Sequence, residues 1–252
     1  MPNLLRAFAL GLAAICVPAT AFANDPLPRF EDPLCPGVAG LRADAAAEVV
    51  GRIRDNAQRI GLTLAADGDC HPNLIVAFLD DGQAFLRSLH QNKPLLFADM
   101  NLNDTRALLA DPGPARALLS TMVRTRDGMP VPRRDNMEHI PQTGMWNAHS
   151  RIYTPTRRDI ISALIVFDSG AIEGLSLTQM ADYATMRGLA PPSSTRAMGD
   201  GSILSIFDSE SAPAEMTAGD RVLLATLYGG IPNLPATARM AGLERAVRSA
   251  GE

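Results

Sequence analysis

The stretch from Arg157 to Asp168, RRDIISALIVFD, constrains the fold more than any other part of the sequence. From Ile160 to Phe167 every residue is apolar except Ser162, and its isoleucine, valine and phenylalanine favour strands. A strand that is apolar on both sides is typical of the centre of a sheet whose two faces are both covered. We therefore expect a layered protein with this segment as its central strand.

The rest of the chain carries alternating helical and strand patterns. Apolar residues recur at helical spacing over 42–61, and Gly61 is a typical helix end. The apolar run within 71–81 indicates a second buried strand. The other expected elements are a helix over 82–92, two short helical segments within 103–123 broken at Pro112 and Pro114, an edge strand over 146–154, and helices over 217–228 and 234–250. This mixture predicts an α+β fold, with a mixed sheet and packed helices.

The first 23 residues have the layout of a secretory signal peptide. Arg6 precedes an apolar stretch, Ala7 to Val17, and Ala21-Phe22-Ala23 forms a small-x-small cleavage site. The apolar stretch is too short for a permanent transmembrane helix, and no other segment is long and apolar enough. We therefore expect a mature chain that begins at Asn24, has no transmembrane segment, and is periplasmic or secreted.

The mature chain is expected to form one domain. Its first part, 24–40, begins with a proline-rich stretch that should run extended. The remainder, 41–252, has a length that suits a single α+β domain. Between its strands, 124–145 is polar and without periodicity, and long loops of this kind are often functional.

Two cysteines, Cys35 and Cys70, remain once the signal peptide is removed. An even number of cysteines in an exported chain predicts a disulfide. The loop that it closes should stabilise the fold by about 3–4 kcal/mol in the chain-entropy description. Neither cysteine lies in a C-x-x-C pattern, so we do not expect them to bind zinc.

Charge is unevenly distributed along the chain. The net charge of −4 argues against a general nucleic-acid binder. The range 124–158 contains only three acidic residues but seven arginines: Arg124, Arg126, Arg133, Arg134, Arg151, Arg157 and Arg158. Arginine clusters suit carboxylate or phosphate groups, so this cluster is a candidate site for an anion or a partner. The alternative is a solvated loop whose arginines form salt bridges.

The stretch GLSLTQMADYATMRGLAPP, 174–192, predicts a helix with a defined start and end. Ser176 and Gln179 have capping-box spacing, so the helix should begin at Ser176. Gly188 is a natural stop, and Pro191-Pro192 prevent continuation.

This helix has the rhythm of the extended zinc-protease motif H-E-x-x-H-x-x-G-x-x-H. Two histidines at i and i+4 share a helix face and bind zinc, while the intervening glutamate is the general base. In this chain Asp182 falls on the glutamate and Gly188 on the glycine. Ala181, Thr185 and Pro191 fall on the three ligand positions. Alanine and proline side chains cannot bind a metal, so the pattern predicts no zinc site.

Segments around this helix resemble a known family. Gly188-Leu189 closes the helix, Ser205-Ile206-Phe207 follows, and DRVLLATLYGG forms a leucine-rich segment containing Leu-Tyr. In patches between Leu41 and Gly229, the chain resembles an uncharacterised family of exported bacterial proteins with a zincin-like, metzincin-related pattern. The resemblance implies a zincin-like fold that contains the peptidase helix. It does not imply zinc, because this chain differs at every ligand position.

Other chemistry has little support in the sequence. The chain has no G-x-S-x-G motif, no phosphate loop and no dinucleotide fingerprint. Its histidines are scattered: His71, His90, His139 and His149. Convergence of three on a metal remains an alternative, although none is paired at helical ligand spacing. Asp80-Asp81 are expected to cap the helix that starts near Gly82.

Two interpretations of function follow. The first is an exported, soluble, zincin-like protein that acts through binding or in envelope structure, with a protein or envelope partner and without a cofactor. In it, Asp182 is structural and is held by Arg187 or by backbone donors of 191–195. The alternative is a divergent peptidase or other hydrolase that uses Asp182 as its acid or base.

Overall fold

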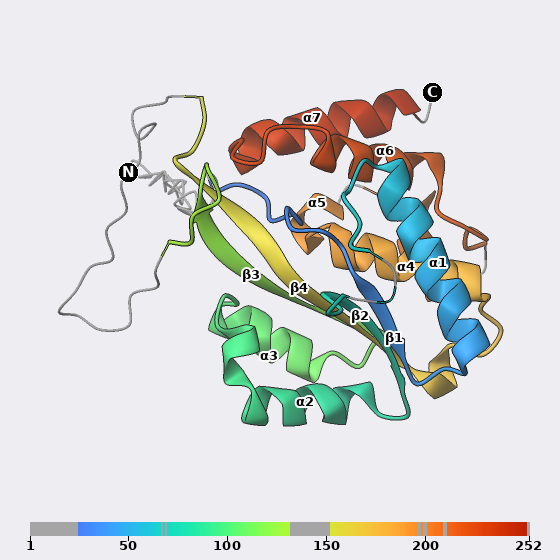
Figure 1. The fold of residues 1–252 in the computed structure, drawn as a ribbon. Coiled ribbons are helices and arrows are strands. Elements are labelled where there is room, and N and C mark those ends of the chain that lie inside the picture. Colours follow the sequence, from blue (N-terminus) through green and yellow to red (C-terminus); the bar gives the residue numbers. More distant parts are fainter. Residues whose placement is uncertain are drawn as a thin grey trace, which may run out of the picture.

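A computed structural model of the chain describes residues 25–66, 68, 70–131, 152–195, 198, 201–208 and 211–250. Within these residues the fold is α+β, as predicted, with seven α-helices and a four-stranded mixed sheet (Figure 1). The strands are β1 (Pro36–Ala39), β2 (Leu74–Leu79), β3 (Ala115–Thr125) and β4 (Thr156–Asp168). The helices are α1 (Ala43–Arg59), α2 (Gly82–Asn92), α3 (Leu102–Ala110), α4 (Leu177–Leu189), α5 (Pro192–Thr195), α6 (Ala218–Tyr228) and α7 (Ala236–Ala250). Short 3₁₀ turns are η2 (Pro94–Phe97), η3 (Ser169–Ala171) and η5 (Ile203–Ser205).

Strand β4 occupies an inner position of the sheet, whose order is β1-β2-β4-β3. It runs parallel to β2, with Leu74 opposite Ala163, and antiparallel to β3, with Ala115 opposite Phe167. Its apolar residues are buried on both sides, Ile165 and Val166 being fully so. The prediction of a central strand covered on both faces is therefore confirmed.

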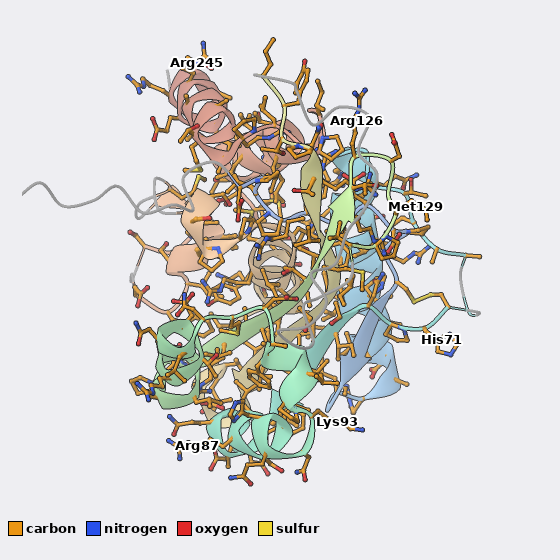
Figure 2. The ribbon with its side chains drawn as sticks, turned by 90° about the vertical axis from the view of Figure 1, so that its left-hand side faces the viewer. His71, Arg87, Lys93, Arg126, Met129 and Arg245 are labelled. Atoms are coloured by element: carbon orange, nitrogen blue, oxygen red, sulfur yellow. A yellow bond between two sulfur atoms is a disulfide. The ribbon has the colours of Figure 1, made fainter. Side chains whose placement is uncertain are left out.

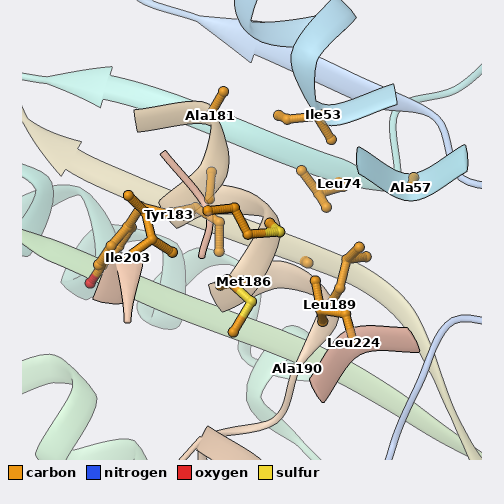
Figure 3. Close-up of a cluster of buried hydrophobic side chains, with 14 of the residues drawn as sticks. Ile53, Ala57, Leu74, Ala181, Tyr183, Met186, Leu189, Ala190, Ile203 and Leu224 are labelled. Carbon is orange, nitrogen blue, oxygen red and sulfur yellow. The ribbon is translucent and has the colours of Figure 1, made fainter. Parts of the chain in front are cut away.

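Helices form a layer on each face of the sheet. Figure 1 shows α1 and α4 on one face, with α6 and α7 beyond them, and α2 and α3 on the other. The apolar stripe expected within 42–61 packs into the core through Val49, Ile53 and Ala57. Together with side chains of α4 and β2 it forms the buried cluster in Figure 3. Helix α4 is therefore a central part of the core.

The segment before α1 belongs to the same fold. Leu27, Phe30 and Leu34 are buried in the core, and β1 pairs in parallel with β2. The predicted disulfide between Cys35 and Cys70 is present, with 6.1 Å between their Cα atoms. It joins the residue before β1 to the loop before β2, and so fixes the ends of two neighbouring strands.

The region 103–123 differs from its prediction. Helix α3 accounts for its first part, but 115–125 form strand β3 and not a second helical segment. Pro112 and Pro114 end helical structure, and the chain that follows pairs along its length with β4. Such long-range pairing outweighs the local helical pattern. Of the edge strand expected over 146–154, only 152–154 are described, and they form no strand.

Helix α4 begins as predicted and ends differently. The Ser176–Gln179 capping box is present. Gly188 does not stop the helix, which continues to Leu189. A Cβ atom at Gly188 would lie 2.8 Å from Cδ1 of Leu74, so glycine here permits close packing of α4 on β2. The end comes at Ala190, which is extended because a residue before proline disfavours the helical region.

Among the helices of the described residues, none combines the length and apolar character that crossing a bilayer requires.

Candidate functional site

Asp182, which falls on the glutamate position of the zinc-protease motif, is buried between α4 and α1. Its exposed fraction is 0%, and its carboxylate accepts four hydrogen bonds. Arg52 binds it in bidentate fashion, from Nε to Oδ1 at 2.8 Å and from Nη2 to Oδ2 at 2.7 Å. Asn56 Nδ2 donates to Oδ1, and the backbone N–H of Met216 donates to Oδ2, both at 2.6 Å. The carboxylate therefore ties together α1, α4 and the segment before α6.

The four donors keep the Asp182 carboxylate charged in spite of its burial. Burial raises the pKa of Asp182, but hydrogen bonds from Arg52, Met216 and Asn56 lower it by more, so the pKa lies below its ordinary value. The same pair raises the pKa of Arg52. At its outer end, Arg52 also forms an ion pair of 3.0 Å with the exposed Glu215.

The donors to Asp182 are not those that we expected from the sequence. Arg187 lies five positions further along α4, which turns its side chain about 140° away. Arg52 and Asn56 come instead from α1, more than 120 residues earlier in the chain. Such a partnership leaves no local signal in the sequence.

Two positions aligned with zinc ligands lie in the core against α1. Ala181 and Thr185 both have an exposed fraction of 0%. The Thr185 hydroxyl donates to the Ala181 carbonyl at 2.8 Å, which uses its proton within the helix. Figure 3 shows Ala181 among apolar neighbours. The third position, Pro191, lines a groove on another side of α4.

Four of the seven arginines in the predicted anion cluster are described, and three of them already pair with acids. Arg124 binds Asp32 through two hydrogen bonds of 3.0 and 2.9 Å, and Arg157 binds Asp159 at 3.0 Å. Arg158 lies 3.6 Å from Asp25.

The remaining described member of this cluster, Arg126, is exposed at the surface (Figure 2). Arg133, Arg134 and Arg151 lie outside the described residues. Burial raises the pKa of Asp159, and Arg157 and Arg124 offset this rise only in part. Three of the four described arginines thus behave as members of salt bridges. Anion binding by the whole cluster stays a prediction.

A groove of about 760 Å³ borders the edge strand β3. Its floor includes alternate residues of that strand, Ala117, Leu119 and Thr121. Helix α3 contributes one wall, and the chain after α4 contributes another through Pro191 and Pro192. The charged lining residues are Asp99, Asp104, Asp111, Arg158 and Arg187. The groove is therefore mainly apolar, with charges of both signs.

Arg187 is the distinctive polar group of this groove. Its Nε is buried without a hydrogen-bond partner. Among the described residues no carboxylate or other acceptor binds its guanidinium. Sequence reasoning missed the groove because 115–125 were expected to be helical, and β3 forms its floor. The available signal was an arginine in the last turn before Pro191-Pro192, which is also a common way to stabilise a helix C-terminus.

The described histidines do not gather around a common centre. His71 is exposed (Figure 2), and His90 packs edge-on against Phe97 with 4.9 Å between ring centroids. His139 and His149 lie outside the described residues. No group of three or more histidine, cysteine or acidic side chains is placed to hold a metal in the part of the chain that the structure describes. Asp81 caps α2, accepting from the Ala84 N–H at 2.8 Å.

Comparisons of the chain with protein-family models, curated proteins and solved structures find no match.

Proposed function

We propose that this is an exported binding protein of the cell envelope, in which the zincin-like helix α4 is structural and not catalytic. The observation that carries the proposal is the state of Asp182. Its carboxylate is inaccessible to solvent and accepts hydrogen bonds from Arg52, Asn56 and Met216.

A catalytic acid or base must reach the proton that it transfers, within hydrogen-bond distance of the substrate. An ionised carboxylate offers roughly four lone-pair sites, and four donors already use those of Asp182. The lowered pKa of Asp182 also makes it a weak base near neutral pH. All three properties suit a residue that holds helices together and oppose a role in proton transfer.

The ligand positions support the same conclusion. Ala181 has no ligating atom, and Thr185 is buried with its hydroxyl bound to the backbone. Metal binding at this face of α4 would require α1 to move away from it. The zincin-like fold, inferred from the resemblance alone, would then persist here as a scaffold.

Export is the second part of the proposal. The signal-like first 23 residues predict it, and the Cys35–Cys70 disulfide suits an oxidising compartment. Expression of the full chain should give a periplasmic or secreted protein whose intact mass begins at Asn24 and includes the disulfide. A full-length, reduced protein found only in the cytoplasm would contradict export.

Metal analysis and hydrolysis assays test the absence of catalysis. The mature protein should contain no stoichiometric zinc after extensive dialysis. It should hydrolyse neither peptide nor envelope substrates in a way that depends on Asp182. One zinc per chain would overturn the proposal and make the scattered histidines candidate ligands. Hydrolysis that Asp182→Asn abolishes, with unfolding unchanged, would make α4 an active-site helix.

A further inference from the structure

Among the described residues, the outer edge of β3 is open where it borders the groove. Strand β4 pairs with one side of β3, and on the other side 129–131 reach only Val123, Arg124 and Thr125. Just before β3, the Asp168 N–H donates to the Pro114 carbonyl at 2.9 Å, so even-numbered residues direct their backbone groups toward β4. Near the other end, the Val131 N–H donates to the Val123 carbonyl at 3.0 Å on the opposite edge. Odd-numbered residues of β3 therefore direct their N–H and C=O groups away from β4.

Three of these odd-numbered residues, Ala117, Leu119 and Thr121, also line the groove with their side chains. Within the described residues, no backbone hydrogen bond reaches the outward groups of these three. An open edge of this kind is a template for another strand. Strand addition uses the backbone groups for affinity, and pockets for alternate side chains provide specificity.

The size of the groove suits a short extended segment. From Ala117 to Thr121 the strand spans roughly 14 Å at the usual rise per residue. A partner strand of about five to seven residues would cover this length. The volume of about 760 Å³ lies within the ordinary range of ligand sites.

The charges restrict what such a segment carries. The Arg187 guanidinium has no acceptor among the described residues, and its Nε is buried. A carboxylate would match its planar donors. Asp104 and Asp111 on the α3 side already accept hydrogen bonds, from Asn101 Nδ2 and from the Gly113 N–H respectively. Their negative charge disfavours a polyanion, so a single carboxylate among apolar groups fits best.

We propose that the groove binds an extended peptide segment of a partner protein, which adds to β3 as a further strand. The segment carries apolar side chains and one acidic side chain, whose carboxylate pairs with Arg187. This assignment rests on the proposed binding function and names its site and partner class. The placement of Arg187 supports an acid within the segment, because Arg187 lines the same groove as Ala117, Leu119 and Thr121.

The test begins with random heptapeptides displayed on phage and selected against the immobilised mature protein, with Arg187→Gln as the counter-selection. Selected sequences should share one acid between apolar residues. Arg187→Gln should lower the affinity of the protein for a selected synthetic peptide about tenfold or more, as measured by calorimetry. This is the effect of losing one charge-assisted hydrogen bond. Arg126→Gln is the matched control, since Arg126 is exposed and lies outside the groove. It should leave the affinity unchanged.

Strand addition is tested on the peptide itself, so that no variant has to fold. Methylating alternate backbone nitrogens removes donors from one edge of an extended peptide, and one of the two alternating sets should abolish binding. Leu119→Pro, which removes an outward N–H at an edge where proline is tolerated, should have the same effect. Far-ultraviolet circular dichroism confirms that this variant is folded.

Several outcomes would overturn the assignment. One is a selection that yields no peptide preferred over the Arg187→Gln counter-selection. Another is a selected peptide whose binding is unaffected by either of the two alternating patterns of backbone methylation. Dimerisation in sedimentation that Leu119→Pro abolishes would assign the edge to a second copy of this chain. Tight binding of octanoate that excludes the peptide would assign the groove to small carboxylates. None of these measurements involves zinc or hydrolysis, so failure here is distinguishable from failure of the proposed function.

Discussion

The two sides of α4 each carry a charged side chain, but only one of these side chains has hydrogen-bond partners among the described residues. Asp182 faces α1 and accepts four hydrogen bonds, two of them from Arg52. Arg187 lines the groove beside β3 and has no acceptor among the described residues. A buried charge with every site satisfied holds elements together, whereas a charged group left without a partner in a groove is available to a ligand. The difference separates the structural side of this helix from the side to which we assign binding.

The structural side should show the largest effect. Arg52→Met leaves the Asp182 carboxylate buried without its cation, and breaking a buried pair in this way costs about 3–5 kcal/mol. Urea denaturation should therefore show a free energy of unfolding reduced by that amount, with a folded baseline still present. A loss below about 1 kcal/mol would show that the Arg52–Asp182 pair contributes no more to stability than an exposed ion pair does.

The matched control for Arg52→Met is Glu215→Gln. Glu215 binds the same guanidinium at 3.0 Å, but its side chain is 59% exposed. An exposed ion pair contributes about 0–1 kcal/mol, so this variant should unfold almost as the wild type does. The two variants together separate buried from exposed interactions of Arg52.

Gly188→Ala tests the packing of the same helix. The new Cβ would lie 2.8 Å from Leu74 Cδ1, and overpacking of this kind costs about 1–3 kcal/mol. Leu74→Val should recover part of the loss when the two changes are combined. In contrast, Gly51→Ala in α1 meets nothing within 4 Å, so it should stabilise by about 0.5–1 kcal/mol through helix propensity. Equal effects of the two alanine variants in denaturation would contradict the close approach of α4 to β2.

Acid should weaken the structural side of α4 through Asp182. Because the folded pKa of Asp182 is lowered, its stabilising contribution is complete above the ordinary carboxyl pKa. That contribution is lost as pH falls through the folded pKa. Asp159 has a raised pKa and acts in the opposite direction, its contribution being lost as pH rises through that value.

Urea midpoints between about pH 6 and pH 2 check this dependence. The difference between wild type and Asp182→Asn should narrow as the solution becomes more acidic. A constant difference over this range would show that the Asp182 pKa is not lowered by folding.

The sequence predicts those parts of the fold whose signals are local. The apolar run of β4, the stripe of α1, the capping box at Ser176 and the pairing of Cys35 with Cys70 all appear in the structure. Each depends on apolar periodicity, on residues adjacent in the sequence, or on the number of cysteines. None requires knowledge of which segments meet in space.

What the sequence does not predict depends on contacts between distant segments. Strand β3 forms because β4 pairs with it, although its local pattern suggested a helix. The sequence predicts a helix end at Gly188, but the structure shows that glycine is required there because Leu74 packs against it. Asp182 is the residue that the sequence singled out, but its donors on α1 could not be read from its neighbours. The groove and the role proposed for Arg187 follow only once β3 is recognised as an edge strand.

The most direct test is the difference in the free energy of unfolding between Asp182→Asn and Arg187→Gln, measured in urea at neutral pH. Asp182→Asn should lose about 2–4 kcal/mol, because charge-assisted hydrogen bonds are broken and Arg52 loses its main partner. Arg187→Gln should stay within about 1 kcal/mol of the wild type, since it loses only a favourable charge at a helix C-terminus. Equal losses, or a larger loss for Arg187→Gln, would contradict the division of α4 into a structural side and a binding side.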